Sequence, residues 1–295
     1  MYSFSKYPTA ALLLILGLVS FSACQKEVFS TAAKPATQGL ATESRAANGD
    51  MVGVSLKNGT NPSQLVIMND VTGVVTSAVN VFWSTYQLTD LKGVCYANNR
   101  YIICNDADPT DPFTVAFYEV NLNGQATHMY DIPNEFGVIS DIDYDANKDV
   151  MYGLADNSNS LVAVNNFFAG PVAADFVATN ITGLAKGFTA QGLAIIEGTI
   201  YVAASSPSAT TNLYSVDPAT GAATLVGALG PAGDLQGGHS GIGYDSDFNR
   251  FLINRGATAT SLGLNRITWP LPGGGNITAD WGADDYDFED LITYP

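Results

Sequence analysis

The sequence predicts an all-β fold in which one four-stranded motif is repeated around a closed ring. Three observations predict it: the composition, a fivefold internal repeat, and chain ends that complement one another. Only 14% of the 295 residues are charged, against about 25% in an average soluble domain, while Gly (29), Tyr (14) and Phe (14) are plentiful. Such a balance favours strands and turns and excludes a helical bundle or a coiled coil.

Five segments share one pattern, in which apolar residues alternate with small or polar ones. The third positions of the pattern are residues 93, 141, 192, 241 and 290, so the repeats are 48, 51, 49 and 49 residues apart. A regular period of this length is the sequence signature of a repeat architecture. The predicted first strands are 91–96, 139–144, 190–195, 239–244 and 288–293, and each of the first four is followed by three further apolar runs. Those runs are 101–104, 115–120 and 126–130; 150–154, 160–164 and 174–178; 200–203, 212–216 and 222–226; and 251–253, 263–267 and 277–281.

The two ends of the repeat array complete one another. The last repeat contains only its first strand, whereas the N-terminal portion contains only later strands, at 51–55, 64–68 and 74–79. Pairing the two ends makes one more four-stranded unit and removes the open strand edges that invite aggregation. Residues 49–295 number 247, or five repeats of about 49. We therefore expect a single five-bladed β-propeller, closed by pairing of the C-terminal strand with the N-terminal strands.

One repeat also carries a recognisable motif. Residues 213–227 read LYSVDPATGAATLVG, in which Pro218 and Gly221 suit a short hairpin. This segment resembles the repeat consensus of several uncharacterised bacterial β-propeller families, and the other repeats resemble it more loosely. The resemblance implies a fold and no particular activity, because propellers include hydrolases, lyases, lectins and scaffolds.

The N-terminus has the features of an export signal. Residues 1–23 have a single charge at Lys6, an apolar run at 10–19, and small residues ahead of Cys24. Together with Cys24 this segment resembles the lipobox of bacterial lipoproteins, although Phe21 stands where Leu is usual. The resemblance implies that Cys24 is lipidated, becomes the mature N-terminus and anchors the chain in the cell envelope, with the outer membrane as the expected location. An ordinary secretory signal with Cys24 as a plain thiol is the alternative.

Domain organisation follows from these segments. We predict a signal peptide at 1–23, a lipidated flexible tether at 24–48, and the propeller at 49–295. The tether has no hydrophobic periodicity, and a coil of about 24 residues spans roughly 25 to 30 Å. The sequence leaves open which face of the membrane carries the anchor.

Net charge limits the partners of this chain. The formal charge is −16, and it becomes −17 when Lys6 leaves with the signal peptide. This charge repels phosphate backbones and anionic lipid surfaces, so we expect no nucleic-acid binding and no membrane contact except through the lipid.

If the first strands line a central channel, the loops between fourth and first strands lie on the same face of the ring as the loops between second and third strands. We call this face the upper face. The opposite face is the lower face. Long loops on a rigid scaffold are the usual place for binding, so we expect the site on the upper face. The predicted channel mouth is ringed by Lys92, Ser140, Asp141, Gln191, His239, Ser240, Glu289 and Asp290.

These mouth residues have a chemical and a structural interpretation. Asp141, Glu289 and Asp290 are suited to hold a cation or to divide into the acid and base of a glycosidase, and His239 is suited to transfer a proton. The structural alternative is that the carboxylates are solvated, or held by backbone amides and Lys92. Because no sequence signature of a catalytic family accompanies these residues, we favour a non-enzymatic role.

Aromatic residues in the upper loops are a second candidate binding feature. Trp83, Tyr86 and Trp281 suit a platform for a sugar ring or a peptide, since aromatic rings offer a large contact area. The structural alternative is that they fill gaps between blades. We place Trp83, Tyr86, Lys92, Asp141, Gln191, His239, Trp281 and Asp290 in the candidate binding set.

Metal and cysteine chemistry receive little support. Residues 145–149 and 245–249 alternate oxygen-bearing side chains like the start of a calcium loop, but the sixth positions hold Val150 and Arg250 instead of Gly. We therefore expect no cofactor and no metal site, with calcium as the minor alternative. Cys95 and Cys104 flank a tight turn, and both a disulfide and two buried thiols remain open.

Three functions remain after these exclusions. The favoured one is a lipid-anchored envelope propeller that binds a glycan, a peptide or a partner protein. The alternatives are an envelope glycoside hydrolase or lyase that uses Asp141, Glu289 and Asp290, with His239 as a further candidate, and a purely structural partner in an outer-membrane complex.

Overall fold

The computed structural model describes residues 50–57, 62–105, 115–155, 158–206, 209–229, 241–254, 264–271, 277–282 and 286–293. The signal peptide, the tether, His239 and Ser240 lie outside these residues. Within the described part of the chain, no helix is long and apolar enough to cross a membrane. The described residues all belong to a compact unit that spans 42–295.

Within the described residues, the strands form five antiparallel groups of four. The first group joins the two chain ends, and the other four follow in chain order. The groups are β21 (Tyr286–Thr293), β1 (Asp50–Lys57), β2 (Ser63–Asn69) and β3 (Val75–Trp83); β5 (Leu91–Ala97), β6 (Arg100–Asn105), β7 (Val115–Val120) and β8 (Gln125–Ile132); β9 (Ile139–Asp145), β10 (Val150–Ala155), β11 (Ser160–Asn165) and β12 (Phe176–Asn180); β13 (Thr189–Ile196), β14 (Thr199–Ser206), β15 (Ala209–Val216) and β16 (Ala223–Ala228); and β17 (Ile242–Asp245), β18 (Arg250–Asn254), β19 (Leu264–Thr268) and β20 (Ile277–Gly282).

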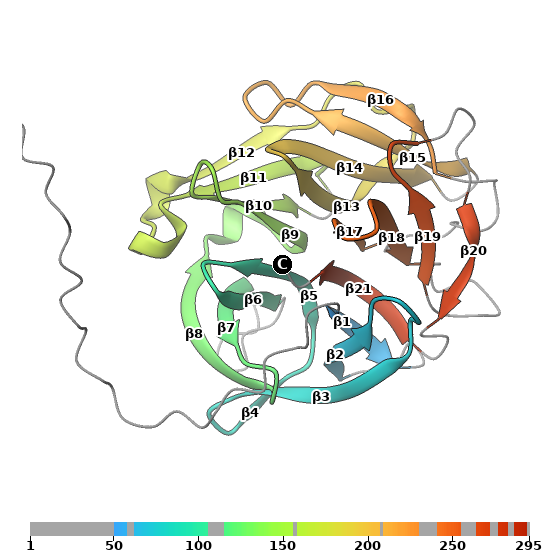
Figure 1. Cartoon of the computed structure of the whole chain (residues 1–295). Coiled ribbons are helices and arrows are strands. Elements are labelled where there is room, and N and C mark those ends of the chain that lie inside the picture. The colour runs from blue at the N-terminus through green and yellow to red at the C-terminus, as the bar shows by residue number, and fades with distance from the viewer. Residues whose placement is uncertain are drawn as a thin grey trace, which may run out of the picture. The chain divides into compact units, whose positions relative to one another are not determined.

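The first strands of the five groups surround a common axis (Figure 1). Each of these inner strands contacts the next, in the cyclic order β5, β9, β13, β17, β21 and back to β5. Tight hairpins on the lower face lead from inner to second strands, at 98–99 and 197–198 for example, where positive φ angles suit Asn98, Asn99 and Gly198. The all-β propeller prediction is therefore confirmed, and the number of groups equals the number of repeats.

The ring closes as the sequence predicts. β21 pairs with β1 in antiparallel register from Met51 with Thr293 to Lys57 with Tyr286, with a bulge between Val54 and Ser55. This pairing completes the first blade from the two ends of the chain. It also covers an edge of β1 that would otherwise present unpaired backbone N–H and C=O groups.

A hydrophobic cluster lies at each junction between neighbouring blades. For example, Val52 and Leu65 of the first blade pack with Val94 and Ile103 of the second, and all four are fully buried or nearly so. The other four junctions have clusters of the same kind. Burying apolar side chains between blades stabilises the ring by roughly 25 cal/mol for each Å² of apolar surface removed from water.

Several local features differ from the prediction. β3 extends to Trp83, adds the short strand β4 (Tyr86–Leu88) and pairs in parallel with the start of β8, which joins the first two blades into one sheet. β12 begins at Phe176, two residues later than expected, because the 3₁₀ turn η3 (Ala173–Asp175) precedes it. The remaining 3₁₀ turns are η1 (Asn134–Phe136) and η2 (Phe167–Ala169).

Candidate functional site

The inner strands meet one another through the third position of the repeat. Directly before β17 this position is Gly241, where an added Cβ would lie 2.6 Å from the Cα of Asp290, so only glycine permits this approach. In β9 and β21 the same position is aspartate. The side chain of Asp141 accepts a hydrogen bond from the N–H of Leu193 (2.7 Å), and that of Asp290 accepts one from the N–H of Val94 (2.7 Å). Each aspartate therefore ties its strand to the next inner strand of the ring.

Asp141 and Asp290 are in contact with one another. Both side chains are buried, with exposed fractions of 0% and 1%, and a hydrogen bond joins their carboxyl groups. Burial raises the pKa of Asp141 well above its usual range, and the neighbouring Asp290 charge raises it further. Burial also raises the pKa of Asp290, although hydrogen bonds from Asp141 and from the N–H groups of Val94 and Leu291 oppose the rise. Two carboxyl groups in such contact share a proton, and we place it on Asp141.

Asp143 lies two residues further along β9 and is partly buried. Its carboxylate accepts hydrogen bonds from the N–H of Ile195 on β13 (2.6 Å) and from the N–H of Tyr144 (2.7 Å). Burial raises the pKa of Asp143 to about 7, against 3.8 for an ordinary aspartate, although both hydrogen bonds lower it. The group therefore titrates near neutral pH.

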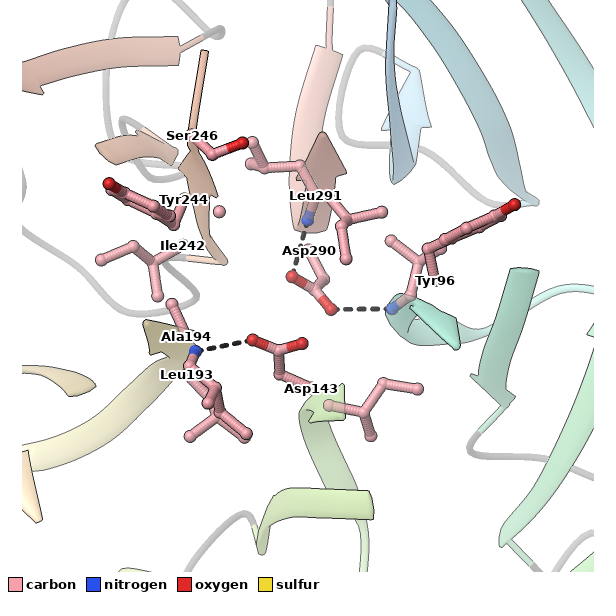
Figure 2. Close-up of a pocket in the computed structure, with 14 residues that line it drawn as sticks. Tyr96, Asp143, Leu193, Ala194, Ile242, Tyr244, Ser246, Asp290 and Leu291 are labelled. Carbon is pink, nitrogen blue, oxygen red and sulfur yellow. Dashed lines mark hydrogen bonds between the residues drawn. The ribbon is translucent and has the colours of Figure 1, made fainter. Parts of the chain in front are cut away.

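A pocket of about 190 Å³ lies on the ring axis, where all five inner strands contribute to its wall. Figure 2 shows Asp143 and Asp290 pointing from different strands toward its middle. Most of the remaining wall is apolar, and Ser246 brings the pocket to the hairpins of the lower face. The lining residues are Val94, Tyr96, Ile142, Asp143, Leu193, Ala194, Ile195, Ile242, Gly243, Tyr244, Ser246, Asp290, Leu291 and Ile292.

These positions change the interpretation of the predicted channel mouth. Asp141 and Asp290 do not form an exposed ring of carboxylates, because both are enclosed between inner strands. The pocket reaches the lower face, opposite to the face where we expected binding. The upper-face loops at 58–61, 106–114, 156–157, 207–208, 230–240, 255–263 and 283–285 lie outside the described residues.

The other predicted mouth residues are held by neighbours. Lys92 lies 3.1 Å from the carboxylate of Asp90 and 4.0 Å from that of Glu289. Ser140 is buried and donates a hydrogen bond to the carbonyl of Leu154 (3.3 Å). The side-chain oxygen of Gln191 accepts a hydrogen bond from the hydroxyl of Ser205.

The predicted aromatic residues are brought together only in part. The ring of Trp83 packs against Tyr118 (5.9 Å between centroids), His128 (5.4 Å) and Tyr86 (6.3 Å), so Trp83 fills the junction between the first two blades. Tyr86 is 48% exposed, and its hairpin lies beside the second blade, where the N–H of Phe82 bonds to the carbonyl of Gly124 in the turn before β8. Trp281 belongs to β20, and the structure describes its backbone but not its side chain.

The two calcium-like loops form turns that use their own carboxylates. The carboxylate of Asp145 accepts a hydrogen bond from the N–H of Asn147 (3.0 Å) and forms an ion pair with Lys148 (2.7 Å). The carboxylate of Asp245 accepts a hydrogen bond from the N–H of Asp247 (3.1 Å) and forms an ion pair with Arg250 (2.7 Å). Within the described residues, no group of three His, Cys, Asp or Glu side chains is arranged to hold a metal ion.

Cys95 and Cys104 are both buried thiols and do not form a disulfide with one another. The sulfur of Cys95 lies 3.6 Å from that of Met151, and that of Cys104 lies 3.9 Å from the carbonyl oxygen of Ile139. Burial and the charge of Asp143 raise the pKa of Cys95 well above its usual range, so this thiol stays protonated. Of the two alternatives left open by the sequence, the structure has the buried thiols.

Comparison with solved structures agrees with the architecture. A chain in the crystal structure of a nidogen/laminin complex matches with a TM-score of 0.51 and 10% identity, over 83% of this chain and 82% of that one. TolB from Acinetobacter baumannii matches with a TM-score of 0.44 and 10% identity, over 82% and 67% of the two chains. The glutaminyl cyclase of Myxococcus xanthus matches with a TM-score of 0.43 and 13% identity, over 65% and 76%.

The fold is a β-propeller. The nidogen/laminin match supports this assignment, and at 10% identity it concerns the fold alone. No family model and no curated protein sequence matches the chain.

Proposed function

We propose that this chain is a lipid-anchored propeller of the bacterial cell envelope that binds a glycan, a peptide or a protein partner and does not act as an enzyme. The observation that supports this choice is the burial of Asp141 and Asp290. A glycosidase keeps its two carboxyl groups about 5 to 9.5 Å apart, with the sugar between them. In this chain the same two groups are hydrogen-bonded to each other and enclosed between strands.

The exposed hairpin of β3 and β4 offers a surface for such a partner. Tyr86 is half exposed beside Trp83, and the two rings lie 6.3 Å apart on one hairpin. Paired aromatic rings stack on sugar rings and on extended peptides, and such anchors dominate binding energy.

The binding proposal is tested with glycan and peptide arrays and the full chain. For a ligand found in this way, we expect Tyr86→Ala to weaken binding about tenfold or more. Phe248→Ala is the matched control, because Phe248 is a similarly exposed aromatic residue on the lower face. Equal affinities of the Tyr86→Ala variant and the unmodified chain would contradict the proposed surface. Turnover of a polysaccharide that Asp141→Asn abolishes would instead favour the glycoside hydrolase or lyase.

The anchor is tested separately, by fractionating cells that express the full chain. We expect Cys24→Ser to move the protein from the membrane fraction to the soluble fraction, because no acceptor for the lipid remains. Cys95→Ser is the control, since this thiol is buried in the propeller. Retention of the Cys24→Ser variant in the membrane fraction would overturn the lipid anchor and leave the binding proposal intact.

A further inference from the structure

The axial pocket combines aliphatic walls with carboxyl groups, and this combination suits one class of ligand. Its sides are built from aliphatic residues, among them Ile142, Leu193, Ile242 and Leu291. Its volume of about 190 Å³ equals that of about six water molecules in the liquid, at roughly 30 Å³ each. The pocket therefore has room for an organic molecule of about six non-hydrogen atoms.

The charged groups in the described lining of this pocket are acidic, and its other polar side chains are those of Tyr96, Tyr244 and Ser246. Asp143 and Asp290 point into it, and its described lining contains no Lys, Arg or His (Figure 2). Behind them, Asp141 is completely buried, and its Oδ1 accepts no hydrogen bond from any N–H or hydroxyl of the described residues. Buried carboxyl groups are stable when they are protonated or paired with a cation. The proton shared by Asp141 and Asp290 removes the repulsion between these two carboxyl groups. It does not neutralise the negative charge of Asp143.

We propose that the axial pocket binds a small organic ammonium ion, with its nitrogen against the carboxylates of Asp143 and Asp290 and its hydrocarbon part against the aliphatic wall. This site is independent of the partner proposed for the hairpin at Tyr86. The carboxylates favour a cation over an anion, and the aliphatic wall favours a ligand with a hydrocarbon part. A calcium ion needs six to eight oxygen ligands, which two carboxylates that already accept backbone N–H groups do not supply.

The surroundings of Asp143 determine the pH dependence of binding. The titratable groups near it are Asp141 and Asp145 on β9, Cys95 and Tyr96 on β5, Asp290 on β21 and Tyr244 on β17. Asp145 is paired with Lys148, and the thiol of Cys95 and the shared proton of Asp141 stay in place at neutral pH. Because the pKa of Asp143 is about 7, this carboxyl group changes charge between pH 5.5 and 8, whereas an alkylammonium ion keeps its charge over the same range.

The experiment is calorimetric titration of the full chain with n-butylammonium chloride, using n-butanol as the neutral analogue. We expect n-butylammonium to bind at pH 8 and to bind about tenfold more weakly at pH 5.5. We expect Asp143→Asn to weaken binding at pH 8 to a similar degree and to remove the pH dependence. The matched control is Glu197→Gln, which removes an exposed carboxylate from a lower-face hairpin outside the pocket lining and is expected to leave affinity unchanged.

Folding of each variant is checked by circular dichroism and thermal unfolding, so that loss of binding is not confused with loss of structure. The proposal is overturned if n-butanol binds as tightly as n-butylammonium, or if affinity is the same at pH 5.5 and pH 8. It is also overturned if a folded Asp143→Asn variant binds as the unmodified chain does, or if potassium chloride at equal concentration displaces n-butylammonium. None of these outcomes bears on binding at Tyr86.

Discussion

Residues 241 and 290 occupy the same position of the repeat and meet the next inner strand in different ways. Gly241 lets the backbone of β21 approach, whereas Asp290 places a carboxylate against the N–H of Val94 on β5. Asp141 does the same between β9 and β13. A carboxylate that bonds to a backbone N–H across a seam satisfies a buried donor, and this explains aspartates at the centre of an otherwise apolar ring.

The shared proton leads to opposite expectations for two similar substitutions. In Asp141→Asn the amide nitrogen replaces the protonated oxygen and the amide oxygen still accepts from Leu193, so we expect a change below about 1 kcal/mol in unfolding free energy. Asp290 accepts N–H groups with both oxygens, from Leu291 (2.6 Å) and Val94 (2.7 Å). Asp290→Asn turns one acceptor into a donor, so we expect a loss of about 1 to 3 kcal/mol. Urea denaturation at pH 7 measures both, and equal losses would contradict this placement of the proton.

The raised pKa of Asp143 makes stability depend on pH. Its pKa is about 7 in the folded chain and 3.8 as the ordinary value, so the folded state binds more protons between these limits. The free energy of unfolding therefore falls as pH rises from about 4 to about 7. We expect the unmodified chain to lose at least about 1 kcal/mol over this range relative to Asp143→Asn, or a few degrees in Tm. Thermal unfolding of both chains at pH 4.5 and pH 7.5 measures the difference, and parallel pH profiles would contradict the expectation.

At the scale of elements, the hairpins between inner and second strands repeat one local design. Tyr144 donates a hydrogen bond to Asp149 (2.6 Å), and Tyr244 donates one to Asn249 (2.7 Å). In both hairpins a first aspartate accepts N–H groups of its own turn and pairs with a cation. The alternating oxygens that resembled a calcium loop are thus accounted for by turn geometry.

The second hairpin allows a test of a buried ion pair. Arg250 pairs with Asp245 and also donates to the carbonyl of Asp70, and both charged side chains are buried. We expect Arg250→Met to reduce the free energy of unfolding by about 3 to 5 kcal/mol, because it leaves the carboxylate of Asp245 without its cation. The matched control is Arg100→Met, whose pair with Glu119 is exposed and is worth about 1 kcal/mol or less. Similar losses in urea denaturation for the two variants would contradict this account.

The elements were largely predictable from the sequence, and the site was not. Repeat spacing places the inner strands, since the third positions at 93, 141, 192, 241 and 290 all fall within an inner strand or directly before it. The contact between Asp141 and Asp290 joins residues almost 150 positions apart, and it depends on how far each strand inclines toward the axis. A strand pattern alone does not indicate whether a third-position side chain faces solvent or the neighbouring strand. One signal in the sequence pointed to this contact. The third position of the repeat is Gly at 93, 192 and 241 but Asp at 141 and 290.

At the scale of the whole molecule, the junctions between neighbouring blades hold the ring together. Hydrophobic clusters lie at every junction of the described blades, and the seams add hydrogen bonds from Asp141, Asp143 and Asp290. Such a ring is complete only when its two ends meet, because each blade buries its faces against two neighbours. Closure by β21 is therefore the step on which the other junctions depend.

β21 contributes the fully buried ring of Phe288, which packs with Met51, Val66 and Leu252 between the last blade and the first. We expect Phe288→Ala to reduce the free energy of unfolding by about 3 to 5 kcal/mol, because it leaves a cavity at the closing junction. Phe248→Ala is the control, since Phe248 is 46% exposed, and we expect a loss below about 1 kcal/mol.

Removal of residues 286–295 tests closure directly. It exposes the edge of β1, empties its side of the cluster around Phe288, and deletes the carboxylate that binds Val94. Because these losses act together at one junction, we expect the shortened chain to lack a cooperative transition in urea denaturation followed by circular dichroism. A shortened chain with the same midpoint and slope as the full chain would mean that the remaining blades are stable without closure.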